Sequence, residues 1–135
     1  MTTSTAVKTN RTLIAAATSN AAGSATRGAV DLRTAFGGLL TVKLTNGGTG
    51  PTVQATAYVM VAHDTGTLPA TGAAGTVWKT IATVIGGGTT ASAVTEGSMD
   101  IPAGIMHLQV EVSGNTGQAV TCEAFFSELT STSSV

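Results

Sequence analysis

Two apolar runs decide the fold: Ile105-Met-His-Leu-Gln-Val-Glu-Val-Ser113 and Gln118-Ala-Val-Thr-Cys-Glu-Ala-Phe-Phe-Ser-Glu-Leu129, joined by Gly114-Asn-Thr-Gly117. Apolar and polar residues alternate along each run, and this two-residue period is typical of a strand with one buried face. A short loop rich in Gly and Asn between two such runs predicts a β-hairpin. The apolar face of that hairpin must then be covered by other parts of the chain.

The alternation assigns the side chains of both runs to faces. The core face is expected to hold Met106, Leu108, Val110, Val112, Val120, Cys122, Ala124 and Phe126. The other face of the first run is polar and is expected to lie in solvent; it carries His107, Gln109, Glu111 and Ser113. Cys122 is the only cysteine, so its place on the core face predicts a buried thiol with no disulfide partner in the chain.

Further strands are predicted upstream of these runs, each bounded by turn residues. The clearest is Leu40 to Leu44, where apolar residues alternate with Thr and Lys before the turn sequence Asn46-Gly-Gly-Thr-Gly50-Pro51. The longest is expected to be central in its sheet and runs from Thr52 to His63. The remaining candidates are Thr12 to Thr18, Thr26 to Leu32, Val77 to Ile85 and Ala93 to Ile101. For the first of these a short helix is also open, although its Thr and Ile residues favour a strand.

Seven or eight short strands with turn signals between them predict an all-β protein, either an antiparallel β-sandwich or a jelly roll. A chain of 135 residues has the length of one domain, so we expect a single domain over residues 1–135. Residues 1–10 and 130–135 are rich in Thr and Ser and have little to bury. We expect them to be extended polar arms that gain order by pairing with neighbouring subunits.

Two segments are candidates for contacts with a partner. Residues 64–76 contain Gly, Ala, Thr and Pro without any period, which predicts a long surface loop. The strand Val77 to Ile85 has apolar residues on both faces, so either one face meets a partner or both faces are buried within the domain.

The low charge of the chain excludes several classes of partner. Charged residues make up 10% of the sequence and the formal net charge is −1, so no large basic or acidic field is available for nucleic acid or an anionic membrane. No run approaches the roughly 20 apolar residues that span a bilayer. Lys8, Arg11 and Leu13-Ile-Ala-Ala-Ala17 resemble a signal peptide, but the apolar run is too short, so secretion by this route is not expected. A surface with so few charges predicts a homo-oligomer or a chain that aggregates, and an inert surface coated with Thr and Ser is the alternative.

The sequence offers no convincing catalytic, cofactor-binding or metal-binding residues. His107 and Glu111 would need further ligands to hold a metal ion, and a nucleophile pair of Cys122 and His107 fails because the two side chains are assigned to opposite faces. His63 is expected at a strand end. The Gly-Gly pairs lack the Lys-Ser/Thr sequence of a phosphate-binding loop. Isolated acids that are expected in turns are Asp31, Asp64 and Asp100. We therefore expect that the protein is not an enzyme.

The block from Gly104 to Leu129, together with the Ala/Thr/Gly-rich remainder, resembles small virion structural proteins of tailed bacteriophages, in particular capsid decoration or cement proteins. This resemblance implies a β-domain that binds the major capsid protein or another virion protein, commonly as trimers, and reinforces the shell without chemistry. It implies location in the virion, after assembly in the host cytoplasm. Small tail and head–neck proteins are similar in composition, so the place on the particle stays open.

A second class of function is a binding module that recognises a carbohydrate or a host receptor through the loops 64–76 and 86–90. A sugar site usually needs exposed aromatic side chains. Trp78 and Tyr58 lie in predicted strands and not in these loops, which argues against this alternative.

Overall fold

The computed structural model describes residues 3–63 and 66–134, and every regular element within them is a strand. The strands are β1 Thr3–Asn20, β2 Thr26–Asp31, β3 Gly38–Asn46, β4 Thr56–Ala62, β5 Lys79–Ile85, β6 Val94–Ile101, β7 His107–Ser113 and β8 Val120–Ser134. The segment Thr12 to Thr18 belongs to β1 and is not a helix. The predicted all-β fold is therefore confirmed.

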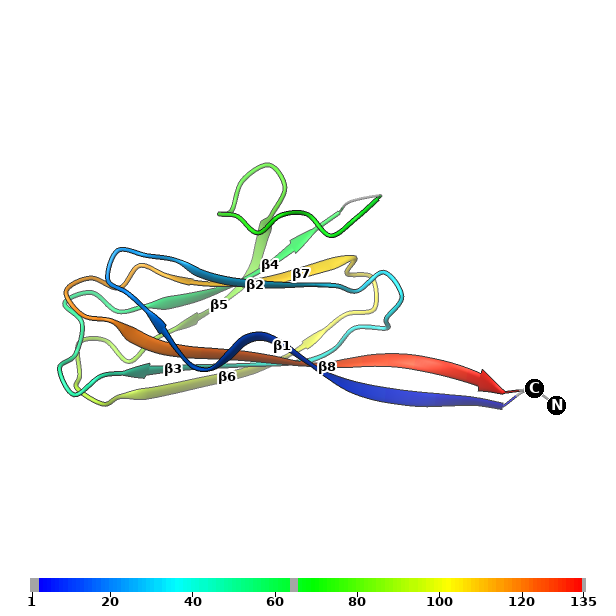
Figure 1. Ribbon diagram of the computed structural model, residues 1–135, viewed down its shortest axis with the longest axis horizontal. Helices are drawn as coiled ribbons and strands as arrows, with labels where there is room; N and C mark the ends of the chain where they lie inside the picture. The colour runs from blue at the N-terminus through cyan, green and yellow to red at the C-terminus, as the bar shows by residue number, and fades with distance from the viewer. Residues whose placement is uncertain (1–2, 64–65, 135) are drawn as a thin grey trace.

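The strands form two antiparallel sheets that lie one above the other (Figure 1). Sheet A has the order β1-β8-β3-β6, and sheet B has the order β2-β7-β4-β5. β1 pairs with β8, β2 with β7, β3 with β6 and β4 with β5. The chain is thus one long hairpin, with β1–β4 and β5–β8 as its arms, rolled into two layers. This topology is that of a jelly roll, one of the two β-architectures that the sequence predicted.

The predicted hairpin between the two C-terminal runs is wrong. β7 lies in sheet B between β2 and β4, whereas β8 lies in sheet A between β1 and β3. Segment 114–119 therefore crosses from one sheet to the other. The crossing is held by Asn115, a buried residue whose amide donates to the carbonyl oxygens of Asn20 (3.1 Å) and Gln118 (2.9 Å). Gly and Asn allow a sharp change of direction, but they do not determine whether the next strand pairs or crosses.

The core between the sheets follows the predicted alternation except at Met106, which precedes β7 and is half-buried, while Ile105 packs against the core. Leu108, Val110 and Val112 of β7 face Val120, Cys122, Ala124 and Phe126 of β8 across the sandwich, and β3 adds Leu40, Val42 and Leu44. Cys122 is 2% exposed and is a free cysteine, as predicted. Burial raises the pKa of its thiol to about 11, because a thiolate would lose its hydration there.

The terminal arms differ from the expectation of loose segments that await a neighbouring subunit. They pair with each other, in a regular antiparallel register from Thr3 with Ser134 to Asn10 with Ser127. Figure 1 shows this part of β1 and β8 extending well beyond the two sheets. This pairing could not be predicted, because strings of Thr and Ser carry no apolar period that would specify a partner strand.

Candidate interaction surfaces

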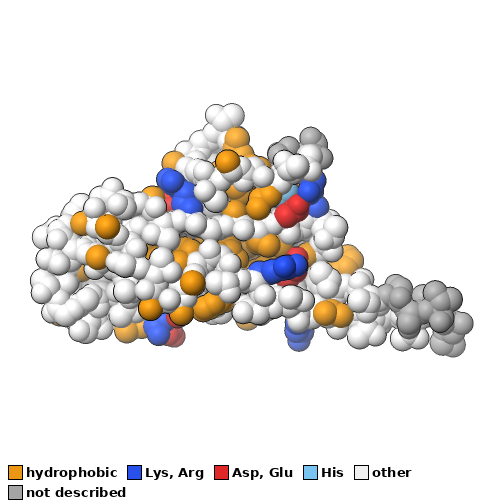
Figure 2. All heavy atoms as spheres, in the orientation of Figure 1, with side chains coloured by type: hydrophobic (Ala, Val, Ile, Leu, Met, Phe, Trp, Pro, Cys, Tyr) orange, Lys and Arg blue, Asp and Glu red, His pale blue; other side chains and the backbone are white. Residues whose placement is uncertain are grey.

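The terminal ribbon, defined as residues 3–8 of β1 and 129–134 of β8, is the most unusual surface of the molecule. Lys8 is its only charged residue, and most of its described side chains are exposed Thr, Ser and Ala. In Figure 2 its described part is largely white, which marks uncharged polar side chains and backbone. Two strands without a covering layer are at best marginally stable in water. The ribbon therefore presents main-chain groups rather than a distinctive set of side chains.

The base of the ribbon is fixed to the sandwich by an ion pair and by main-chain bonds. The Arg11 guanidinium donates from Nε to Glu128 Oε2 at 2.7 Å, and Glu128 is 3% exposed. Leu129 donates its N–H to Gly37 O (2.9 Å) and accepts from Phe36 N–H (2.7 Å). These bonds mark the last position at which β8 has a neighbour on both sides, since β3 begins at Gly38 opposite Glu128. Beyond this point β8 pairs with β1 alone.

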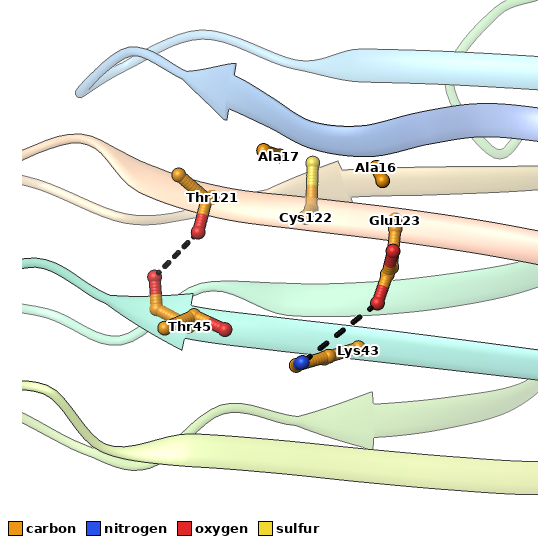
Figure 3. A pocket seen from close by; sticks show the side chains of 7 residues that line it. All are labelled: Ala16, Ala17, Lys43, Thr45, Thr121, Cys122 and Glu123. Atoms are coloured by element: carbon orange, nitrogen blue, oxygen red, sulfur yellow. Dashed lines mark hydrogen bonds and ion pairs between the residues drawn. The ribbon is translucent and has the colours of Figure 1, made fainter.

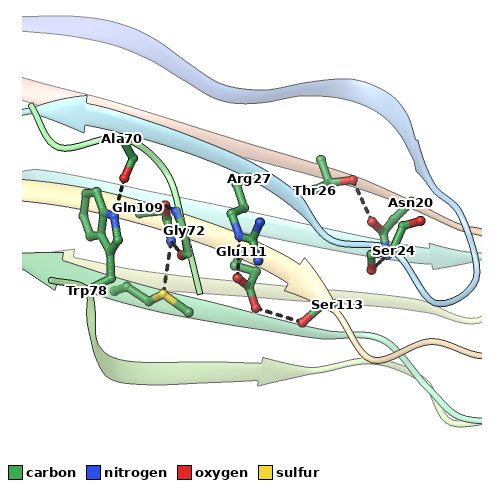
Figure 4. Close-up of polar contacts among 11 residues, drawn as sticks. Asn20, Ser24, Thr26, Arg27, Ala70, Gly72, Trp78, Gln109, Glu111 and Ser113 are labelled. Atoms are coloured by element: carbon green, nitrogen blue, oxygen red, sulfur yellow. Dashed lines mark hydrogen bonds and ion pairs between the residues drawn. The ribbon is translucent and has the colours of Figure 1, made fainter. Parts of the chain in front are cut away.

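Part of the outer face of sheet B is covered by residues 66–78, here called the strap. The side-chain amide of Gln109 pairs with the main chain of Gly72, accepting its N–H at 2.9 Å and donating to its carbonyl at 2.7 Å (Figure 4). Trp78 is 2% exposed, packs on Met60 and Ala62, and donates from Nε1 to Ala70 O at 2.9 Å. The predicted surface loop is confirmed, since most of residues 66–78 are exposed, and Ala70, Gly72 and Trp78 tie it to sheet B.

The structure corrects the expectation for the polar face of β7. His107 and Gln109 are fully buried and Glu111 is 6% exposed, whereas all three were expected in solvent. Glu111 accepts from Arg27 Nε at 2.6 Å and from Ser113 Oγ at 3.0 Å. No signal in β7 itself indicated this burial, because the covering residues lie elsewhere in the chain and have no period.

His107 is the least satisfied polar side chain of this face. Both ring nitrogens are buried and neither has a hydrogen-bond partner. Its Nδ1 lies 3.5 Å from Asp31 Oδ1. Asp31 is held by the Arg33 guanidinium, which lowers the pKa of the carboxyl group to about 2, chiefly through side-chain hydrogen bonds. This carboxylate is therefore paired with a cation.

The structure does not bring together the residues that the sequence analysis weighed as a metal site or as a nucleophile pair. This holds for residues 3–63 and 66–134. No group of three or more His, Cys, Asp or Glu side chains that could hold a metal ion occurs there. Cys122 and His107 lie in different sheets. His63 and Asp100 are exposed, and Asp64 lies outside the described residues. Within the described part of the chain there is also no helix long and apolar enough to cross a membrane.

A hollow of about 240 Å³ lies beside a bulge of β1, below the 300–1,000 Å³ typical of ligand pockets (Figure 3). Between Ile14 and Thr18 the register of β1 against β8 shifts, and Ala17 has a φ of 57°. The bulge opens the hollow over Lys43, Thr121, Cys122 and Glu123. Lys43 lies 4.0 Å from both Glu96 and Glu123, so its charge is compensated within the sheet.

The structure also shows where the strand predicted to meet a partner, β5, and the aromatic residues Trp78 and Tyr58 lie. β5 is an edge strand whose Ala82 and Val84 pack on the core, while Ile81 and Ile85 are 49% and 56% exposed. The extra residue at Ile81 relative to β4 is a β-bulge, a device that discourages edge pairing. Trp78 is buried and Tyr58 is half-buried, so neither is a platform for a sugar ring.

No protein-family model matches the sequence, and no curated protein matches it either. Several solved structures share its architecture. The K3 cleaved adhesin domain of Lys-gingipain from Porphyromonas gingivalis is 14% identical, with a TM-score of 0.53, over 83% of this chain and 72% of that domain. At this identity the similarity shows the fold alone.

Two further structures are similar to a lesser degree. The SPBc2 prophage-derived protein YomS is 18% identical over 91% of this chain and 95% of its own, with a TM-score of 0.44. VP2 in the infectious bursal disease virus subviral particle is 14% identical over 93% of this chain and 32% of its own, with a TM-score of 0.46. Structures of similar arrangement thus include a prophage-derived protein, a viral particle protein and an adhesin domain.

Proposed function

We propose that the protein is a non-enzymatic structural protein of a virion, a decoration or cement protein that binds the outside of a capsid lattice and stabilises it. The terminal ribbon is the observation that carries this proposal. It is a two-stranded, nearly uncharged extension with unpaired strand edges, and an element of this kind gains stability when another protein adds to its edges. The jelly roll supplies the rigid body from which the ribbon extends.

The low charge of the chain and its nearly uncharged ribbon fit a role in which each copy makes a weak contact that is repeated many times. Each subunit contributes a modest contact, and a closed lattice multiplies that contact over many copies. A role without catalysis fits the isolated acids and histidines described above. The major capsid protein is the expected partner, while a tail or head–neck location is the runner-up within the same class.

The first experiment is mass spectrometry and antibody labelling of purified particles of the virus that encodes the chain. We expect the protein in mature particles at a fixed ratio to the major capsid protein, with label distributed over the head. Label confined to the tail or neck would move the proposal to the runner-up location. Absence from mature particles contradicts the proposal altogether.

The second experiment tests the ribbon in the binding of the chain to particles that lack it. A chain without residues 1–8 should bind at least about tenfold more weakly, because residues 129–134 lose their partner strand. Its circular dichroism should stay that of the sandwich, since the core side chains of β1 begin at Leu13 and Ile14. The matched control is the double variant Thr5→Val, Thr132→Val, which changes an exposed pair of the ribbon and keeps its main-chain bonds.

A further inference from the structure

We infer that the open edge of β8 beyond Leu129 is a strand-addition site for an extended segment of a partner protein that carries a large apolar side chain. The inference rests on the proposed function and specifies how the ribbon is used. It names the edge, the direction of the added strand and the chemistry of the occupant. Each of these follows from residues at the base of the ribbon.

The edge is identified by the hydrogen bonds of Leu129. Its N–H and C=O both point toward Gly37 and Phe36, on the side of β3 and away from β1. Main-chain groups alternate in direction along a strand, so Ser131 directs its N–H and C=O to the same side. The chain that occupies this side up to Leu129 turns away there, and Gly37, with a φ of 70°, adopts the left-handed conformation that glycine favours. Nothing among residues 3–63 and 66–134 pairs with Ser131 on that side.

The direction of the added strand follows from the neighbour it replaces. β3 runs antiparallel to β8 and pairs with it from Asn46 opposite Val120 to Gly38 opposite Glu128. A segment that continues this row along residues 130–134 extends sheet A with the same hydrogen-bond pattern. An antiparallel strand of about five residues fits the open stretch.

Exposed apolar side chains beside this edge specify the occupant. Phe36 is 56% exposed and Leu39 is 42% exposed, and both lie at the end of the row that the added strand would continue. Strand addition takes its affinity from main-chain bonds and its specificity from side-chain sites of this kind. In the ribbon of a second copy, the apolar side chains larger than Ala are Val7 and Leu129, and both are partly buried within that copy. Its exposed Thr, Ser and Ala side chains could not fill such a site. The occupant is therefore a segment of a different protein, with an aromatic or large aliphatic residue that contacts Phe36.

Because the main-chain groups of Ser131 point to the open edge, two substitutions at this position test whether the edge binds. Ser131→Pro removes the N–H at the open edge, and proline is tolerated where the N–H faces away from the ladder. Ser131→Ala keeps the N–H and is the matched control. Phe36→Ser removes the apolar contact without touching the edge. Both positions are exposed, so we expect all three variants to fold, which circular dichroism and the melting temperature check.

The probe is the acetylated and amidated peptide Thr-Val-Thr-Phe-Thr-Val-Thr, titrated into the full chain by isothermal calorimetry. We expect binding to the wild type and to Ser131→Ala, and at least about tenfold weaker binding to Ser131→Pro and to Phe36→Ser. Equal binding to Ser131→Pro and Ser131→Ala overturns the inference, and so does a lack of binding to the wild type.

Particle binding separates this inference from the proposed function. If the wild type and Ser131→Pro both decorate particles equally well, the protein is a virion protein that does not use this edge, and the inference fails alone. If the peptide binds as expected but the protein is absent from particles, the strand-addition site stands and the virion assignment fails.

Discussion

β7 and β8 carry the same alternation of apolar and polar residues, yet their polar faces have opposite environments. On β8, Thr121, Glu123 and Phe125 are half-buried and Ser127 is exposed on the outer face of sheet A. On β7, His107 and Gln109 are completely buried on the outer face of sheet B. At Gln109 the difference is the strap, whose Gly72 pairs with the side-chain amide, and His107 lies beside Asp31 of β2. A two-residue period therefore identifies the core face of a strand, but it does not show that the other face is in solvent.

Among the variants that test this difference between β7 and β8, Trp78→Ala is expected to lower the free energy of unfolding most. Trp78 fills the space between the strap and Met60 and Ala62, so its removal leaves a cavity that costs about 3–5 kcal/mol of the free energy of unfolding. Chemical denaturation measures this loss, and the polar face of β7 should become accessible to solvent like that of β8. Val77→Ala is the control, because Val77 is 51% exposed and should change stability by less than about 0.5 kcal/mol. Equal losses for the two variants contradict the strap as a packed layer.

Gln109→Leu tests the polar half of the same contact. Leucine keeps most of the volume but removes both hydrogen bonds to Gly72, whose N–H and C=O then lose their protein partner. We expect a loss of about 1–3 kcal/mol and faster hydrogen exchange of the Gly72 amide. Gln118→Leu, at an exposed position, serves as control. If the Gly72 amide exchanges as slowly as in the wild type, the strap is held by other contacts.

Cys122 tests whether the opposite face of β8 is buried in the core. Its raised pKa means that the folded protein keeps the neutral thiol, while the unfolded chain ionises above its ordinary pKa of 9.0. Stability is therefore unaffected below that pH and is lost as the pH rises toward about 11, by about 1 kcal/mol between pH 8 and 10. Cys122→Ala should remove this part of the pH dependence. Labelling of the native thiol at pH 8 should be slow, and rapid labelling at full stoichiometry would show that this face of β8 is not core.

Asp31→Asn is expected to have the smallest effect. Arg33 keeps the pKa of Asp31 depressed to about 2, so the carboxylate contributes stability above its ordinary pKa of 3.8, and this contribution is lost as the pH falls through about 2. The side chain is 35% exposed, so solvent screening limits the contribution to less than about 1 kcal/mol. The measurement is the difference in melting temperature between pH 6 and pH 2 for wild type and variant. Asp100→Asn, at an exposed position, is the control. If both variants reduce the difference in melting temperature between pH 6 and pH 2 equally, Asp31 has no special role.

The sequence predicted individual strands well because the evidence for a strand is local. Leu40, Val42 and Leu44 alternate with polar residues, and the structure places all three in the core. The face assignment of Cys122 was correct for the same reason. The pairing of strands was not predicted, as the supposed hairpin of β7 and β8 shows. A turn rich in Gly and Asn is compatible with both a hairpin and a crossing, and only distant partners such as Asn20 decide between them.

The candidate interaction surface was anticipated only in part. The sequence indicated that the polar ends extend from the domain, but not that they pair with each other, and the exposed Phe36 was not singled out. Its loop, Thr34-Ala-Phe-Gly-Gly38, reads as a break between strands, and its position at the base of the ribbon depends on hydrogen bonds to Leu129. The expected homo-oligomer stays a prediction, which sedimentation of the full chain would test.

By itself, the sequence determined that the protein is built of antiparallel strands, which faces of most of these strands form the core, and that Cys122 is buried. These properties follow from the order of apolar and polar residues over a few neighbouring positions, because successive side chains of a strand point to opposite sides. Only the tertiary structure decided the order of strands, the burial of Gln109 under the strap and the open edge of β8. Each of these depends on contacts between segments that are far apart in the chain, and such contacts leave no local period in the sequence.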